Sequence, residues 1–230
     1  MSFRMPAEWE PHERTLMAWP AEHEGWGKHL DLGRATYAGL ANAIAAFEPL
    51  TMMVNPGDVH SARRELAAEV EILEIVFESA WVRDSGPLVV VDDAGGRLGV
   101  DFGFNGWGER YEYRETAAST AAVLDHLGSA RVESSLVLEG GAITVDGEGT
   151  LITTEQCLLN ENRNPSWTRE EIEADLSSTL GIDQVVWLPW GITADTVTDG
   201  HVDAVCTFSA PGEVLLQTCT DPADPDFDLM

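Results

Sequence analysis

Helical segments recur along this chain at intervals of roughly 50–60 residues, and each is followed by a short strand and then by a pair of strands. The apolar positions between Leu32 and Phe47 recur at helical spacing and predict a helix over 30–47. Further helices are predicted over 59–68, 116–127 and 169–180. The predicted strands are 50–54, 70–77, 88–91, 98–102, 131–135, 142–145, 150–153, 185–188, 202–208 and 214–217. This alternation predicts a repeated α/β module.

The charge of the chain limits the partners that it can bind. The net charge is −27, from 13 basic and 40 acidic side chains, and it repels nucleic acid and anionic membranes while attracting small cations. We therefore expect a small cationic substrate and neither a nucleic-acid nor a membrane partner, and we leave assembly into a homo-oligomer open. The hydrophobic content of 44% is enough to fill the core of a single domain over residues 1–230.

The cysteines and the start of the chain indicate the cellular compartment. Cys157, Cys206 and Cys219 show neither C-x-x-C spacing nor the framework of a disulfide-rich secreted protein. The first residues contain no apolar signal-peptide core, and no apolar stretch is long enough to span a membrane as a helix. We therefore expect a soluble, cytoplasmic protein with reduced thiols.

The segment T-D-G-H-V-D, residues 198–203, is the most informative one for chemistry. If it opens a regular strand, His201 and Asp203 lie two residues apart and project from the same face. A histidine beside a carboxylate can shuttle protons at a useful pKa, or it can be half of a metal site. The two side chains could equally satisfy each other at a strand end. A metal site is less favoured, because no second histidine lies at ligand spacing.

Two further carboxylates lie in unusual local contexts. The Gly-Pro of W-V-R-D-S-G-P, residues 81–87, predicts a turn that presents Asp84, which could grip a guanidinium, pair with Arg83 or cap the turn. In L-E-G-G, residues 138–141, Glu139 lies among apolar residues and glycines. A carboxylate in such a stretch is expected to be buried and to need a cation.

Aromatic residues complete the predicted pocket. F-N-G-W-G, residues 104–108, places Asn105 and Trp107 in a glycine-rich loop, and Trp81 precedes the Asp84 turn. A tryptophan face attracts a delocalised cation, although packing beneath a loop would explain Trp107 as well. Carboxylates, one histidine and tryptophans together fit a guanidinium, which is planar, permanently charged and able to pair bidentately with carboxylates.

These segments resemble the agmatine deiminases and the related bacterial peptidyl-arginine deiminases. The matching motifs are M-P-A-E-W-E-P-H (5–12), M-A-W-P (17–20), W-V-R-D-S-G-P (81–87), F-N-G-W-G (104–108), L-E-G-G (138–141), T-T-E-Q-C-L-L-N-E-N-R-N-P (153–165) and T-D-G-H-V-D (198–203). The resemblance implies the pentein fold, a five-bladed α/β propeller of ββαβ modules with a central active site. About three of the five blades would be present in this chain.

The resemblance also implies roles for individual residues. Asp84 and Asp203 would grip the guanidinium, Glu139 would be a further polar member of the pocket, and His201 would be the general acid and base. Trp81, Asn105 and Trp107 would contact the substrate. The implied reaction uses no cofactor and no metal.

In the reaction that the resemblance implies, a cysteine thiolate attacks the guanidinium carbon and ammonia leaves. Water then hydrolyses the covalent thiouronium, so that agmatine gives N-carbamoylputrescine, a step toward putrescine. The alternatives are a peptidyl-arginine deiminase that forms citrulline, an inactive guanidinium-binding fragment, and a metal-dependent hydrolase built on His201 and Asp203.

One departure from the family pattern concerns the nucleophile. The family carries its cysteine in a Gly-Gly-x-x-His-Cys segment, which does not occur before Met230, and the resemblance gives Cys157 no nucleophilic role. We therefore expect the sequence to be incomplete at its C-terminus. A propeller lacking blades would expose strand edges and apolar faces, so the 230-residue product alone is predicted to be unstable and inactive.

Overall fold

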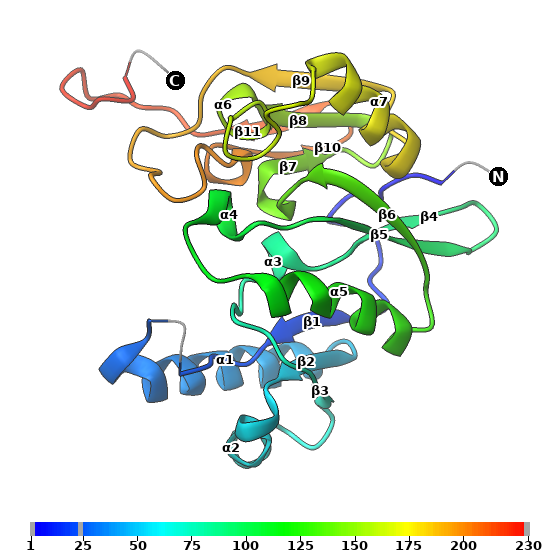
Figure 1. Cartoon of the computed structure of the whole chain (residues 1–230), viewed down its shortest axis with the longest axis vertical. Helices are drawn as coiled ribbons and strands as arrows, with labels where there is room; N and C mark the ends of the chain where they lie inside the picture. Colours follow the sequence, from blue (N-terminus) through cyan, green and yellow to red (C-terminus); the bar gives the residue numbers. More distant parts are fainter. Residues whose placement is uncertain (1–2, 23–24, 228–230) are drawn as a thin grey trace.

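The structure is a series of small sheets that follow one another along the long axis of the molecule (Figure 1). It is a computed structural model that describes residues 3–22 and 25–227. Within these residues there are three three-stranded sheets and one two-stranded sheet, each formed by strands that are consecutive in the sequence. No helix in this part of the chain is long and apolar enough to cross a membrane.

The first sheet is entirely parallel. Its strands are β1 (Thr15–Ala18), β2 (Leu50–Val54) and β3 (Glu71–Glu74), with β2 in the centre. The connections contain η1 (Gly27–His29), α1 (Leu30–Ala45), η2 (Pro56–Asp58) and α2 (Val59–Glu65). All five residues of β2 are buried, as expected for the middle strand of a parallel sheet covered by helices.

The helix predicted over 30–47 is present, but of the apolar positions that predicted it only Ile44 packs against the core beneath the helix. Leu40 is 53% exposed and Phe47, just beyond the helix end, is 91% exposed. The small residues Ala38 and Ala41 pack against the sheet instead, because short side chains let the helix approach β2 closely.

The second sheet has the ββαβ order. Strands β4 (Leu88–Val91) and β5 (Arg97–Gly103) form an antiparallel hairpin. Helix α5 (Arg114–His126) then returns the chain to β6 (Ala130–Val137), which pairs with β5 in parallel. The hairpin turns where Asp92 accepts hydrogen bonds from two later backbone N–H groups and Gly95 adopts a φ of 81°.

The third sheet repeats this order. Strands β7 (Ile143–Val145) and β8 (Thr150–Thr154) are antiparallel, and β9 (Gln184–Leu188) joins β8 in parallel after α7 (Arg169–Leu180). Helix α7 matches its predicted bounds. It starts at a capping box between Thr168 and Glu171 and ends at Gly181, whose φ is 70°.

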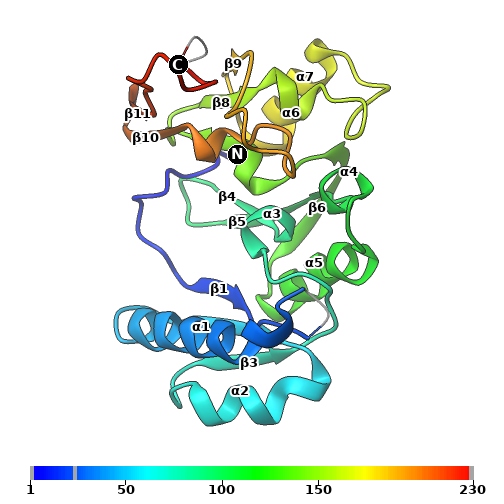
Figure 2. The ribbon, with the colours of Figure 1, turned by 90° about the vertical axis from the view of Figure 1, so that its left-hand side faces the viewer.

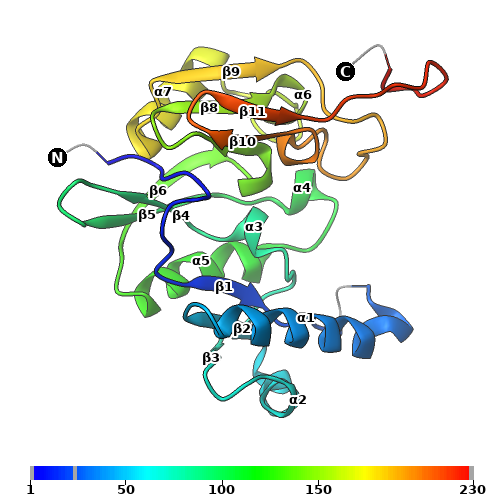
Figure 3. The same ribbon diagram turned by 180° about the vertical axis from the view of Figure 1, so that it is seen from behind.

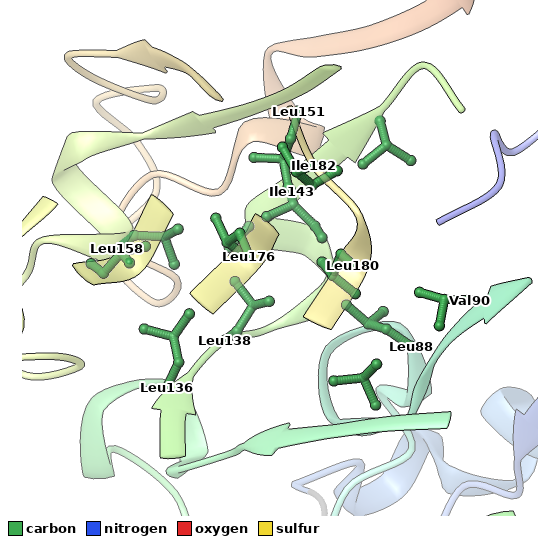
Figure 4. Close-up of a cluster of buried hydrophobic side chains, with 14 of the residues drawn as sticks. Leu88, Val90, Leu136, Leu138, Ile143, Leu151, Leu158, Leu176, Leu180 and Ile182 are labelled. Atoms are coloured by element: carbon green, nitrogen blue, oxygen red, sulfur yellow. The ribbon is translucent and has the colours of Figure 1, made fainter. Parts of the chain in front are cut away.

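The main core lies between the second and third sheets. Figure 4 shows Leu176 and Leu180 of α7 among side chains from strands of both sheets. Leu136 and Leu151, which come from β6 and β8, are fully buried in this cluster. The core therefore holds neighbouring modules together and fixes the loops that emerge between them.

The last strands form a separate hairpin, β10 (Cys206–Ala210) with β11 (Glu213–Leu216), visible beside β8 and β9 from behind (Figure 3). The strand predicted over 202–208 begins late, because η4 (Val202–Ala204) occupies its first residues. The strand predicted over 70–77 is likewise shorter, since β3 ends at Glu74. The predicted ββαβ order is confirmed in the second and third sheets, whereas the first sheet departs from it.

Candidate active site

Four of the predicted site residues meet in the middle of the molecule, although they come from three separate segments. Asp84 lies on α3 (Val82–Ser85), which Figures 1 and 2 show between the first and third sheets. Glu139 immediately precedes η3 (Gly140–Ala142). His201 immediately precedes η4, and Asp203 lies on it. The segment 81–87 was predicted to be a turn and forms this short helix instead.

Gly141 shows how closely three of these side chains approach one another. A Cβ atom added at this glycine would lie 2.6 Å from Nδ1 of His201, 2.7 Å from Oδ2 of Asp203 and 2.7 Å from Oδ1 of Asp84. No side chain fits in that space. The glycine therefore allows one histidine and two carboxylates to converge on a single point.

Asp84 is a buried carboxylate whose oxygens both accept hydrogen bonds. Oδ2 accepts one from Nε1 of Trp107 at 3.0 Å, and Oδ1 accepts one from the backbone N–H of Gly141 at 3.1 Å. Burial raises the pKa of Asp84 above its ordinary value, although the charge of His201 and the N–H of Trp107 act in the opposite direction. Asp84 is therefore a carboxylate that would gain from a further cation.

His201 is buried among carboxylates. Its Nδ1 lies 3.8 Å from Asp84 and 4.0 Å from Asp203, and its Nε2 lies 3.8 Å from Glu139. Among the described residues, no group lies within hydrogen-bonding distance of Nε2. Burial alone lowers the pKa of His201, but the three carboxylates outweigh it and raise the pKa above 6.5. A histidine in this state can hold and release a proton near neutral pH.

The prediction that His201 and Asp203 share one face of a regular strand is wrong. Asp199 and Gly200 have φ values of 60° and 87°, which a strand does not allow, and the carboxylate of Asp195 accepts hydrogen bonds from the backbone N–H groups of Gly200 and His201. The two side chains nevertheless stay close together. Half of the Asp203 side chain is exposed, so solvent reduces the effect of the burial that raises its pKa.

Glu139 is paired with a buried arginine that the sequence interpretation did not include. Nε of Arg163 donates to Oε1 of Glu139 at 2.6 Å, and both side chains are 0% exposed. NH1 of the same guanidinium donates to Asp199 at 2.9 Å. The expectation of a buried Glu139 beside a cation is confirmed.

Trp107 lies in a strained turn beside Asp84. Gly106, Trp107, Gly108 and Glu109, which form α4 (Gly106–Glu109), all have positive φ. Oδ1 of Asn105 accepts from the N–H of Gly108, and its amide nitrogen donates to the carbonyl of Asn162. Asn105 thus holds the turn, and its predicted contact with substrate stays a prediction.

A cleft with a volume of about 1770 Å³ opens onto this cluster. Its walls include Trp107 and Tyr111 together with Trp81, which is 62% exposed. Asp84, His201 and Asp203 also line the cleft. The cleft is long enough to hold a cationic group among the carboxylates and an extended chain along the aromatic walls.

Comparison with known proteins identifies the family. The sequence model described as Porphyromonas-type peptidyl-arginine deiminase matches residues 4–230. The chain belongs to this family. It is 46% identical over 232 residues to the agmatine deiminase of Pseudomonas aeruginosa strain UCBPP-PA14, covering 98% of this chain and 63% of the relative. It is 45% identical to that of Pseudomonas putida KT2440, again covering 98% and 63%.

Solved structures of the family have the same fold. The agmatine deiminase of Enterococcus faecalis superimposes with a TM-score of 0.94 at 36% identity, over 99% of this chain and 64% of that one. A C. jejuni agmatine deiminase with a cysteine-to-serine substitution and substrate bound gives 0.91 at 25% identity, over 100% and 68%. The pentein fold predicted from the motifs is therefore confirmed, and the number of blades stays a prediction. The chain spans about 63% of the length of its curated relatives.

Two of the three cysteines, Cys157 and Cys206, are buried, which disfavours their thiolate forms. Burial and the charge of Glu139 hold the pKa of Cys157 well above its ordinary value. Burial also raises the pKa of Cys206, and Cys219 lies outside the cleft among residues near the chain end. One ligand atom each from Glu139, Cys157 and His201 lie within 4.8 Å of one another, which is a metal-compatible spacing, but Glu139 is already paired with Arg163.

Arg163 and Asp199 belong to the charged network of the candidate site, and the sequence interpretation did not include them. Both lie inside motifs used for the family resemblance, N-R-N-P and T-D-G-H-V-D. A basic residue among three asparagines, in N-E-N-R-N-P, was the available signal for Arg163. Its partners, however, lie 24 and 36 residues away in the sequence, so only the fold brings them together.

Proposed function

We propose that this chain is the guanidinium-binding part of an agmatine deiminase. The observation that carries the proposal is the convergence of Asp84, Asp203 and His201 around Gly141, with Glu139 behind them, on the floor of an aromatic cleft. Two carboxylates without a cation of their own match the paired N–H donors of a guanidinium. The relatives in Pseudomonas and the structural neighbour in Enterococcus faecalis are agmatine deiminases, which supports agmatine as the substrate.

In the proposed reaction, agmatine and water give N-carbamoylputrescine and ammonia, as a step of putrescine biosynthesis in the cytoplasm. Asp84 and Asp203 hold the guanidinium, and a cysteine thiolate attacks its carbon. The C–N bond breaks, and the departing ammonia takes a proton from His201. Water then attacks the thiouronium carbon, His201 accepts a proton from it, and the C–S bond breaks to regenerate the thiolate.

The nucleophile in this proposal comes from the part of the family's length that the chain does not span. Cys157 is unsuited to the role, because its raised pKa keeps it a neutral thiol behind Glu139. The C. jejuni structure with substrate bound was obtained with a cysteine replaced by serine, which supports a cysteine-dependent reaction in a relative.

The test uses the product of the complete reading frame, with agmatine and a peptide ending in arginine as competing substrates. We expect ureido product from agmatine. Asp84→Asn and Asp203→Asn should each lower kcat/KM by about 30- to 5000-fold, corresponding to about 2–5 kcal/mol for one partner of a desolvated charge pair. Asp101→Asn is the matched control, because Asp101 is buried beside Arg131 and does not line the cleft.

Each other outcome identifies a different function. Faster turnover of the peptide would replace agmatine with peptidyl arginine as the substrate. Binding of agmatine by calorimetry, abolished by Asp203→Asn but without ureido product, would make the chain a binding module. Loss of turnover with a chelator would favour a metal-dependent hydrolase.

A further inference from the structure

Arg163 occupies a position from which it reaches two carboxylates of the site without contacting the substrate. Its side chain has no exposed surface, and it is not among the residues that line the cleft. It approaches Glu139 from the side opposite His201. Oε1 of Glu139 accepts from Nε of Arg163 at 2.6 Å, while Oε2 faces Nε2 of His201 at 3.8 Å.

The other end of this guanidinium connects to the turn that carries Trp107. NH1 donates to Asp199, which also accepts two hydrogen bonds from Arg110, at 2.7 and 2.8 Å. NH1 of Arg110 in turn donates to the carbonyl of Trp107 at 2.6 Å. The chain of charged contacts therefore runs from Glu139 to the residue whose indole N–H holds Asp84.

The turn needs such support because its backbone conformation is unfavourable. Trp107 and Glu109 have φ values of 56° and 61°, a region that costs free energy for residues other than glycine. The turn also packs directly on Arg163, since a Cβ at Gly108 would lie 2.7 Å from its NH1. A lysine could not replace these contacts, because one ammonium group cannot bridge two separated carboxylates as a planar fork does.

We propose that Arg163 is a positioning residue: it holds Glu139 with Oε2 turned toward His201, and it holds the Trp107 turn through Asp199 and Arg110. The proposal deepens the function proposed above and rests on it for its effect on turnover. Without the arginine, Oε2 of Glu139 would no longer be held toward Nε2 of His201, so the imidazole would lose a nearby negative charge. Asp84, Asp203 and the neutral thiol of Cys157 would remain near the imidazole.

The experiment compares Arg163→Met and Arg163→Lys in the product of the complete reading frame. The imidazole signals of His201 are followed by NMR against pH, together with kcat/KM for agmatine per folded molecule. We expect Arg163→Met to lower the pKa of His201 and to reduce kcat/KM by about 100-fold, the usual effect of a misplacement of about 1 Å. Arg163→Lys keeps the positive charge, so the pKa of His201 should change less than in Arg163→Met. Its kcat/KM should still fall by about tenfold, because a lysine cannot bridge both carboxylates.

Arg34→Met is the matched control for simple loss of a structural arginine. Arg34 is also mostly buried, bridges Asp58 and the carbonyl of Pro20, and does not line the cleft. This variant should lower the unfolding temperature and leave the His201 titration and kcat/KM unchanged.

The outcomes separate this proposal from the proposed function. A His201 pKa that stays constant or rises in Arg163→Met would overturn the positioning role, whatever the unfolding temperature does. If Arg163→Met does not fold, unchanged kcat/KM and unchanged titration in Arg163→Lys would overturn it. If the wild-type protein does not turn agmatine over, the proposed function fails, and the His201 titration still decides whether Arg163 holds Glu139 beside the imidazole.

Discussion

Replacing Gly141 by alanine tests whether the space between the converging side chains is needed for catalysis. The backbone of Gly141 does not have a positive φ, so alanine is acceptable to the main chain. The added methyl carbon, however, would lie 2.6–2.7 Å from one atom each of His201, Asp203 and Asp84. Since ordinary van der Waals contacts begin at 3.4 Å, each of these three side chains would have to move away from the added methyl carbon by roughly 0.7 Å.

A shift of this size is large for catalysis and modest for stability. Misplacement of reacting groups by about 1 Å costs about 100-fold in rate, so we expect kcat/KM for agmatine to fall by roughly that factor in Gly141→Ala. Overpacking by one methyl group costs about 1–3 kcal/mol, which lowers the unfolding temperature by several degrees. Steady-state kinetics and thermal unfolding of the product of the complete reading frame measure both effects.

Gly39→Ala is a control with the same chemical change in an open place. Gly39 lies on α1, and a Cβ there meets no atom within 4 Å. Because alanine favours a helix over glycine by about 0.5–1 kcal/mol, this variant should be slightly more stable and equally active. If Gly141→Ala keeps kcat/KM within about threefold of the wild type, the three side chains do not converge on the reacting group and the site assignment is wrong.

Two further predictions concern the charge states in the site. Trp107→Phe removes the N–H that favours ionised Asp84. Loss of a hydrogen bond to a charged group costs about 1.5–3 kcal/mol, so kcat/KM should fall about 10- to 150-fold. The acidic limb of the plot of kcat/KM against pH should also move to higher pH, and an unchanged pH profile would contradict this prediction. The raised pKa of His201 contributes stability that is fully present below pH 6.5 and is lost as pH rises through the raised value. Thermal unfolding should therefore show a larger advantage of the wild type over His201→Gln at pH 5.5 than at pH 9, and an advantage that grows with pH would refute the assignment.

Local patterns in the sequence predicted the helices and hairpins well wherever a short-range signal defined their ends. Helix α7 has its predicted bounds because Thr168 and Gly181 cap it at the two ends. The strands predicted over 88–91 and 98–102, and over 142–145 and 150–153, form hairpins whose turns contain an aspartate, Asp92 or Asp146, that accepts hydrogen bonds from the following backbone. Such interactions lie within a few residues and depend little on the rest of the fold.

Long-range packing explains the predictions that failed. The apolar residues of α1 look like a buried face in sequence, but the residues of the helix that are fully buried against the sheet are the small Ala38 and Ala41. The segment before β10 has strand-like composition, yet hydrogen bonds to Asp195 hold it in an irregular path. Burial alone would raise the pKa of Asp195, and these donors together with Thr198 lower it to about 2, so the carboxylate stays ionised as the anchor of this loop.

The candidate site could be predicted as a set of residues but not as a network. Asp84, Glu139 and His201 each follow or precede a glycine-rich or turn-forming segment, and such positions present side chains at the ends of elements. The pairing of Glu139 with Arg163 could not be predicted, because it depends on which loops lie next to each other in the fold. A charged residue in a sequence gives no sign of which residue will pair with it. In the structure both Glu139 and Arg163 are fully buried, and a buried charge needs an oppositely charged partner.

The distribution of charge among the site residues explains why a cation would be selected. Arg163 compensates Glu139, whereas Asp84 and Asp203 share His201, with Arg83 acting on Asp203 as well, and burial still raises the pKa of both aspartates. In the free site these two carboxyl groups therefore favour their neutral forms more strongly than they would in water. A guanidinium bound between them would supply the missing positive charge and offset the cost of ionising both, which a neutral amide or urea of the same shape could not do. In the proposed reaction the same asymmetry would favour release of the product, because the ureido group of N-carbamoylputrescine carries no charge at the position where the guanidinium of agmatine carried one.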